Sequence, residues 1–163
     1  MSESDPDIRL GETRVTLPPA EDATLRFVGR IETPWTERAD CPRQGTLDGP
    51  LCRVEVFEPW VPALDGIEAY PIIEILYWLD KSRRDLVSQS PKSDGRTTGT
   101  FALRSPVRPN PIGTSRVKLI ERQGAFLLVR GLDCLNGTPL VDIKPDRSGY
   151  VPPAPTKAGL VSD

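Results

Sequence analysis

Short runs in which apolar and polar residues alternate recur along the middle of the chain. They lie at residues 25–31, 51–57, 72–79, 99–103, 115–121, 126–132 and 140–143. In the second run Val54 and Val56 alternate with Arg53 and Glu55, which is the period-two pattern of a half-buried strand. The segment 122–125 contains a glycine and separates two runs, so it predicts the tip of a hairpin. The whole pattern predicts strands and little helix.

Helix is expected only as short turns, at residues 62–67 and 81–86. The 163 residues include 18 prolines and 13 glycines, a composition that favours many short elements over long helices. An open sheet of this size would leave exposed edges. We therefore predict an all-β, mainly antiparallel fold: a small closed or half-closed β-barrel with a few short helical turns. The length fits one domain, which we place at residues 23–163.

Charge is unevenly divided along the chain. Residues 1–22 hold six acidic and two basic residues, a net charge of −4, and we expect an acidic, flexible leader there. It lacks the apolar run of a signal peptide and the character of a transit peptide. No stretch of the chain is apolar enough to cross a membrane, so a cytoplasmic protein is predicted. Residues 81–122 hold ten basic and three acidic residues, net +7, which suits a polyanion or, alternatively, an ordinary solvated surface.

Composition excludes several classes of chemistry. The chain has no histidine, which removes Ser-His-Asp hydrolysis, Cys-His proteolysis and the common zinc sites with histidine ligands. It has no glycine-rich dinucleotide motif and no phosphate-binding P-loop. Its three cysteines are an odd number without a C-x-x-C pair, so reduced thiols are expected rather than a disulfide framework. We also expect no metal site.

The most unusual segment, residues 104–115, holds three prolines, two arginines and a glycine. Each proline fixes its φ near about −65° and biases the preceding residue towards extended backbone, so neither a helix nor a central strand is expected to run through it. Two interpretations fit these residues. The segment is either a stiff surface connection or a preset loop that holds a ligand with its guanidinium groups.

Two further segments carry polar side chains suited to ligand recognition. Residues 41–45 read Cys-Pro-Arg-Gln-Gly, and a guanidinium next to an amide suits a carboxylate, a ribose or a base edge. The same residues also make an ordinary polar turn. Residues 131–145 contain Asn136-Gly137, a hairpin signal between apolar runs. Asp142 and Lys144 follow on the returning strand, where we expect them to face the same side.

Together the three segments resemble the TsaA-like proteins, also called TrmO, a family of S-adenosylmethionine-dependent tRNA adenine-N6 methyltransferases. That family carries a Pro-Arg-Gln turn, a Phe-Ala-x-Arg-Ser-Pro-x-Arg-Pro-Asn-Pro-Ile-Gly-x-Ser segment and an Asp-x-x-Asp-Gly-Thr-Pro-x-x-Asp-Ile-Lys-Pro-Tyr segment. Here these are residues 42–44, 101–115 and 133–146. The resemblance implies a small β-barrel that works as a homodimer, with the methyl donor near the subunit interface. The implied substrate is threonylcarbamoyl-adenosine beside the anticodon of tRNA.

The resemblance also implies roles for individual residues. It assigns donor binding to Pro42, Arg43, Gln44, Asp80, Lys81, Arg104, Thr114, Asp133, Cys134, Leu135 and Asn136. Methylation of an amine releases a proton, and our hypothesis is that Asp142, paired with Lys144, accepts that proton or orients the amine. Because the chain ends soon after the last segment, we expect the barrel alone to hold tRNA. The basic residues expected to do so are Arg83, Arg84, Lys92, Arg96 and Arg108.

Three positions depart from the family pattern. Asp80 stands where the family often has a histidine, Asn136 replaces the acidic residue of the Asp-Gly-Thr-Pro turn, and Asp146 replaces a tyrosine. We expect all three near the pocket, where they bear on the substrate more than on the donor. Two alternatives therefore stand beside a tRNA methyltransferase. One is a methyltransferase of the same fold for a small molecule or another nucleotide, and the other is an S-adenosylmethionine-binding module without catalysis.

Overall fold

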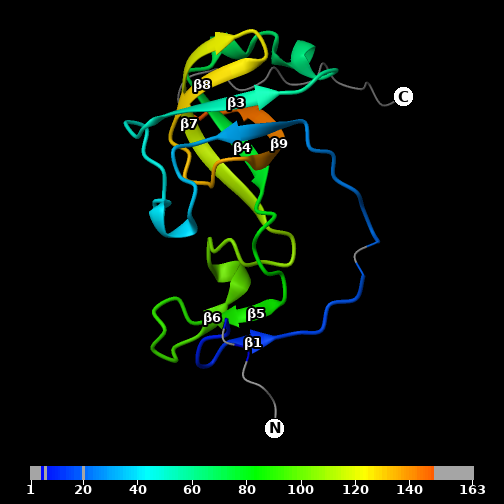
Figure 1. Ribbon diagram of the computed structural model, residues 1–163, viewed down its shortest axis with the longest axis vertical. Coiled ribbons are helices and arrows are strands. Elements are labelled where there is room, and N and C mark those ends of the chain that lie inside the picture. The colour runs from blue at the N-terminus through cyan, green and yellow to red at the C-terminus, as the bar shows by residue number, and fades with distance from the viewer. Residues whose placement is uncertain (1–4, 6, 20, 149–163) are drawn as a thin grey trace, which may run out of the picture.

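The protein consists of a β-barrel and a small separate sheet, as the computed structural model in Figure 1 shows for residues 5, 7–19 and 21–148. Six strands close the barrel in the order β2-β3-β8-β7-β4-β9, and every neighbouring pair is antiparallel. The barrel strands are β2 (Gly29–Glu32), β3 (Leu51–Val56), β4 (Ile72–Trp78), β7 (Ile112–Gln123), β8 (Phe126–Arg130) and β9 (Thr138–Pro145). The predicted all-β fold class is confirmed, and the barrel is closed rather than half closed.

Alternation along the strands sorts side chains between the barrel interior and its outer surface. On β4 the side chains of Ile73, Ile75 and Tyr77 are buried, whereas those of Glu74 and Leu76 are partly exposed. The predicted hairpin at residues 122–125 is also confirmed, because the last residue of β7 pairs with the first residue of β8. The glycine between them has a φ of 62°, in the left-handed region that tight turns require.

The small sheet lies below the barrel in Figure 1 and contains β1 (Thr13–Arg14), β5 (Leu86–Gln89) and β6 (Thr98–Gly99). Its buried residues are largely polar. Gln89 Nε2 donates hydrogen bonds to Thr100 Oγ1 at 3.0 Å and to the carbonyl of Val107 at 2.9 Å. Thr100 Oγ1 in turn donates to the carbonyl of Leu86 at 2.7 Å. These bonds attach the proline-rich segment to the small sheet.

Residues 99–103 were expected to be a strand, and this prediction is wrong. Only Thr98 and Gly99 pair with β5; the chain then turns into a 3₁₀ helix, η4 (Thr100–Ala102). The side chain of Phe101 is 81% exposed, so no second layer covers this run as a strand face would need. The apolar pattern therefore reflects surface residues of a turn.

The predicted helical turn at residues 81–86 is also wrong, since this stretch is a bend that leads into β5. The turn expected at residues 62–67 is present as η2 (Val61–Leu64), and η3 (Ile67–Ala69) follows it. A further 3₁₀ helix, η1 (Arg38–Asp40), was not predicted. All the described helices are single 3₁₀ turns, and none is long and apolar enough to cross a membrane.

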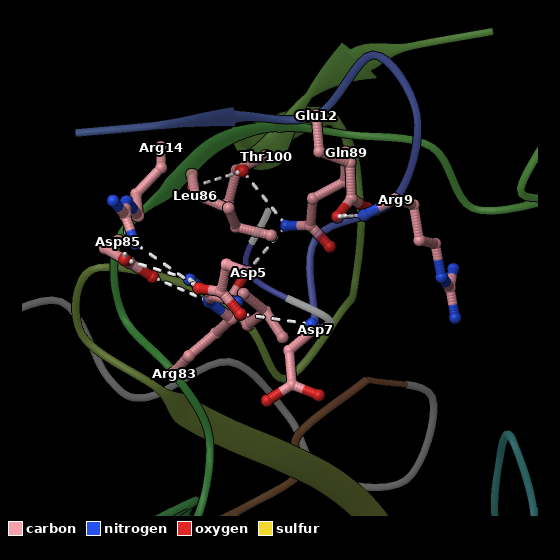
Figure 2. A network of polar contacts seen from close by, with 11 residues as sticks. Asp5, Asp7, Arg9, Glu12, Arg14, Arg83, Asp85, Leu86, Gln89 and Thr100 are labelled. Atoms are coloured by element: carbon pink, nitrogen blue, oxygen red, sulfur yellow. Dashed lines mark hydrogen bonds and ion pairs between the residues drawn. The ribbon is translucent and has the colours of Figure 1, made fainter. Parts of the chain in front are cut away.

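The described residues of the acidic N-terminal segment contribute β1 to the small sheet, and the flexibility of this leader stays a prediction. Figure 2 shows Asp5 between two arginines: its carboxylate accepts hydrogen bonds from Arg83 at 3.1 Å and from Arg14 at 3.3 Å. Arg83 Nε also donates to Asp85 at 2.8 Å. The backbone amide of Ser90 donates to the Glu12 carboxylate at 3.0 Å. Asp5 and Glu12 thus pair with basic and amide donors. Residues 1–4, 6 and 20 of this leader, and residues 149–163 of the predicted domain, lie outside the described part of the chain.

Candidate functional site

Asp133 is the residue at which the predicted segments meet. It follows β8, and its Oδ1 atom accepts a hydrogen bond of 2.7 Å from the Tyr77 hydroxyl at the end of β4. The hydroxyl of Ser115, on β7 at the end of the proline-rich segment, lies 2.8 Å from the Tyr77 oxygen and 3.3 Å from Asp133 Oδ1. Three residues from three separate elements therefore form one polar network at the end of the barrel.

The backbone of the proline-rich segment lies directly against Tyr77. A Cβ atom added to Gly113 would be 2.2 Å from Tyr77 Cε2, so only a glycine allows this approach. Tyr77 is 3% exposed, and burial raises the pKa of its phenol, with a further contribution from the charge of Asp133. The phenol is consequently a neutral hydrogen-bond donor to the carboxylate.

The Pro-Arg-Gln turn packs against the backbone just before Asp133. A Cβ atom added to Gly45 would be 1.9 Å from the carbonyl oxygen of Gly131. Nearby, burial raises the pKa of the Cys41 thiol, and the charge of Asp133 adds to this shift, as expected for neighbouring groups. The side chains of Arg43 and Gln44 are exposed. The structure thus brings the predicted donor-binding turn beside Asp133, with its polar side chains free to contact a ligand.

The Cys134 to Gly137 turn is fixed by the segment that follows β2. The amide of Asn136 donates to the carbonyl of Trp35 at 2.7 Å, and Asn136 Oδ1 accepts from the amide of Thr33 at 3.2 Å. Leu135 is half buried, and burial raises the pKa of the Cys134 thiol to about 12. The predicted Asn-Gly hairpin is wrong, because the strands on either side, β8 and β9, are not neighbours in the barrel. The turn instead carries the chain across the end of the barrel.

Asp142 and Lys144 form a pair on the outer surface of the barrel. Lys144 Nζ lies 3.3 Å from Asp142 Oδ2, which confirms that the two side chains face the same way. Asp142 pairs with Leu76 on one side, and Thr114 pairs with Leu76 on the other. Asp142 and Thr114 therefore lie two strands apart, about 10 Å, on the outer face. Tyr77 points inward, so Asp133 and Asp142 lie on different faces of the sheet.

Three further residues were predicted to bind the donor: Arg104, Asp80 and Lys81. Arg104 is exposed, and its guanidinium lies 3.5 Å from the carbonyl of Thr114, so this contact joins the two ends of the proline-rich segment. Asp80 and Lys81 are exposed in the bend after β4 and have no side-chain hydrogen bond among the described residues.

The basic residues expected to hold tRNA differ in whether their side chains are already bonded to other groups of the protein. Arg83 is paired with the carboxylates shown in Figure 2. Arg84 donates to the carbonyl of Pro109 at 2.6 Å, and Arg108 donates to the carbonyl of Leu103 at 2.7 Å, so both hold the proline-rich segment. The remaining two, Lys92 and Arg96, are exposed in the loop between β5 and β6.

Asp146 does not lie near this site, which corrects the expectation for that departure from the family pattern. Its amide donates to the carbonyl of Ile72, at the far end of β4 from Tyr77. Ile72 and Tyr77 are five positions apart along the strand, about 17 Å. Its carboxylate accepts hydrogen bonds from the Ser148 hydroxyl and from Arg116, and these lower its pKa to about 2. At this position a buried aspartate is paired with an exposed arginine.

Sequence reasoning missed Tyr77 and Ser115 as members of the site. Both lie on predicted strands, at residues 72–79 and 115–121. They occupy inward positions of those strands, where the alternation of apolar and polar residues predicts core residues. A tyrosine at the last inward position of a strand, near a carboxylate that follows another strand, is the signal that could have found them. No cluster of three or more acidic, cysteine or histidine side chains suited to a metal occurs among the residues that the structure describes.

Comparison with known proteins identifies the family of the chain. Residues 30–152 match the model of the tRNA-methyltransferase O N-terminal domain. The chain belongs to this family. It is 58% identical over 150 residues to a probable S-adenosyl-L-methionine-binding protein, VirR, of Rhizobium radiobacter, covering 92% of this chain and 86% of that protein. It is 32% identical over 134 residues to the human tRNA (adenine(37)-N6)-methyltransferase, covering 77% of this chain but 30% of that protein.

Solved structures of the family have the same fold. TrmO from Pseudomonas aeruginosa superposes with a TM-score of 0.64 at 30% identity, and the match covers 78% of this chain and 57% of that one. The chain therefore corresponds to little more than half of the solved TrmO chain and to about a third of the human enzyme.

Proposed function

We propose that this protein binds S-adenosylmethionine and transfers its methyl group to N6 of an adenine in tRNA, with threonylcarbamoyl-adenosine beside the anticodon as the substrate. The observation that carries this proposal is the meeting of the three family segments around Asp133. Support also comes from the relatives, several of which are described as S-adenosylmethionine-binding and two as tRNA (adenine(37)-N6)-methyltransferases.

The donor-binding residues suit the groups that this donor carries. S-adenosylmethionine supplies an electrophilic methyl on a sulfonium cation and also bears a carboxylate and an adenosine. Arg43 and Arg104, both exposed, offer planar donors that suit a carboxylate. Gln44 offers a donor and an acceptor for a base edge. Asp133 offers negative charge beside the Pro-Arg-Gln turn.

For the chemical step we propose that Asp142 accepts the proton released by the methylated amine, with Lys144 holding the carboxylate in place at 3.3 Å. Asp142→Asn keeps the shape of the side chain but removes the base. It is expected to lower turnover about 100-fold or more without changing donor affinity. Single-turnover kinetics and calorimetry measure the two quantities separately. Normal turnover in this variant would remove Asp142 from the mechanism.

We propose Lys92 and Arg96 as the tRNA contacts to test first, because the other three basic residues bond internally and their replacement would disturb the fold. Replacing both by alanine should weaken tRNA binding and reduce the slope of log affinity against log salt by about 1.5 to 2. The matched control is Lys118→Ala, since Lys118 is an exposed lysine on β7 whose side chain has no hydrogen bond or ion pair among the described residues. An unchanged slope in the double variant would rule out this surface.

A homodimer is also proposed. The small sheet buries few apolar side chains, while Phe101 is 81% exposed and Val87 is 44% exposed on it. A second copy of the chain is a suitable cover for these residues. Light scattering should give twice the monomer mass, and Phe101→Ser should shift the mass towards that of a monomer.

The decisive experiment follows methyl transfer directly. Purified protein is incubated with labelled S-adenosylmethionine and bulk tRNA from a strain that lacks its own copy of the gene, and the nucleosides are then separated. Label in N6-methylated threonylcarbamoyl-adenosine is the expected result. Donor binding without transfer to any tRNA would favour the second candidate, a binding module, which the description of several relatives as S-adenosylmethionine-binding proteins also favours.

A further inference from the structure

The hydrogen bonds around Asp133 have a direction that follows from counting protons. A tyrosine hydroxyl has one proton, and the 2.7 Å contact with a carboxylate requires Tyr77 to donate it to Asp133 Oδ1. The Ser115 hydroxyl lies 2.8 Å from the Tyr77 oxygen and donates to Asp133 Oδ1 at 3.3 Å. The result is a network in which the hydroxyls of Tyr77 and Ser115 both lie at the same carboxylate oxygen.

This hydrogen-bond network orients the Asp133 carboxylate so that its two oxygens are not equivalent. Oδ1 is occupied by the Tyr77 hydroxyl and has the Ser115 oxygen 3.3 Å away, whereas Oδ2 accepts no hydrogen bond from any residue that the structure describes. The Tyr77 ring is itself fixed by its burial and by the close approach of Gly113. Asp133 therefore keeps one oxygen free of described hydrogen-bond partners, and it closely follows Gly131, whose backbone the Pro-Arg-Gln turn contacts at Gly45.

A single available oxygen selects among the groups of the donor. The two vicinal hydroxyls of a ribose are bound best by both oxygens of a carboxylate, and here one of the two is already in use. A cation needs only negative charge nearby, and it interacts strongly in a half-buried setting of low dielectric. The arrangement of Asp133 thus suits the sulfonium of S-adenosylmethionine better than its ribose.

We propose that Asp133 contacts the donor sulfonium and that Tyr77 and Ser115 are positioning residues that aim it there. This inference rests on the proposed function and extends it. The site then distinguishes the cationic donor from the neutral thioether product, S-adenosylhomocysteine, by charge. Loss of the positive charge on methyl transfer removes the attraction to Asp133 and favours release of the product.

The test is the ratio of the two dissociation constants, for S-adenosylhomocysteine and for S-adenosylmethionine, measured by calorimetry in wild type and variants. Asp133→Asn is nearly isosteric and removes the charge. It should weaken S-adenosylmethionine binding about tenfold or more and change S-adenosylhomocysteine binding less than about twofold. Tyr77→Phe keeps the ring and loses the hydroxyl, and it should change the ratio in the same direction by about three- to tenfold. Ser115→Ala should give a smaller change of the same sign.

The outcomes separate the two proposals. If wild-type protein binds neither ligand, the proposed function fails. If it binds both, but Asp133→Asn weakens both equally or neither, the sulfonium contact is refuted while the proposed function stands. A purely structural role for Tyr77 would weaken both ligands together and leave the ratio unchanged, which would refute the positioning role. Thermal melting of each variant checks that the folded protein is being compared.

Discussion

Gly45 is expected to be essential for donor binding because no side chain fits between the Pro-Arg-Gln turn and the segment before Asp133. In Gly45→Ala the new Cβ would stand 1.9 Å from the Gly131 carbonyl oxygen and 2.4 Å from its carbon, whereas ordinary contact begins at 3.4 Å. The two backbones must therefore separate by about 1.5 Å. Overpacking of this kind costs about 1 to 3 kcal/mol of stability. A displacement of about 1 Å within a site can cost about 100-fold in activity.

The barrel supplies a control with the same steric defect. In Gly29→Ala the new Cβ would also stand 1.9 Å from a backbone oxygen, that of Glu55, but between β2 and β3. Gly99→Ala is the mild control, since its Cβ meets nothing within 4 Å and its φ of −63° suits alanine. Melting temperatures should fall by about 3 to 10 °C in both clashing variants and little in the mild one.

Calorimetry with S-adenosylmethionine, well below the lowest melting temperature, then separates stability from site geometry. Gly45→Ala should lose at least about tenfold in affinity, while Gly29→Ala and Gly99→Ala should bind like wild type. Wild-type affinity in Gly45→Ala would show that the turn does not form the site. Equal losses in Gly45→Ala and Gly29→Ala would show that binding follows barrel stability alone.

Three further results are expected. The pKa of Asp146 is lowered to about 2, below its usual value of about 3.9, so its contribution to stability is present above pH ~4 and is lost as the pH falls towards 2; acid unfolding of wild type and Asp146→Asn should converge over that range. At pH 8.5 iodoacetamide should modify Cys41 before Cys52 and Cys134, whose thiol pKa values burial raises to about 11 and about 12, and peptide mass spectrometry would reveal any other order. Asp5→Asn should loosen the N-terminal segment at low salt, measured as faster amide exchange in β1, and the difference from wild type should disappear in 1 M salt; a difference that persists in salt would contradict an ionic cause.

Alternation predicted the barrel well because its strands each bury one face. Six of the seven apolar runs are barrel strands, and the Gly124 hairpin joins two of them. The small sheet could not be predicted in the same way. Its strands are two to four residues long, and its buried side chains include Gln89, Ser90 and Thr100, so hydrophobic periodicity does not mark it. Its third strand comes from an acidic segment whose partners lie about 70 to 80 residues away.

The site was predictable in its segments but not in its contacts. The Pro-Arg-Gln turn, the proline-rich segment and Asp133 were expected to act together, and the structure brings them to one end of the barrel. Which side chains touch depends on register. Pairing of Tyr77 with Gly113 on β7 is what brings the tyrosine hydroxyl to Ser115 and Asp133, and a sequence pattern does not contain that register.

The step from Thr114 to Ser115 brings the proline-rich segment to both faces of the sheet, so Thr114 and Asp133, both predicted to bind the donor, lie on different faces. Consecutive residues of a strand point to opposite faces, so Ser115 joins the inner network with Asp133 while Thr114 lies on the outer face in the row that contains Asp142. Methyl transfer requires the two reacting atoms about 3 to 3.5 Å apart. In the proposed reaction, a donor held by Asp133 and an adenine served by Asp142 would therefore meet where the two faces adjoin, at the end of β4 beside the proline-rich segment. A rigid segment would serve that proposed reaction, because movement of its backbone would separate the two reactants.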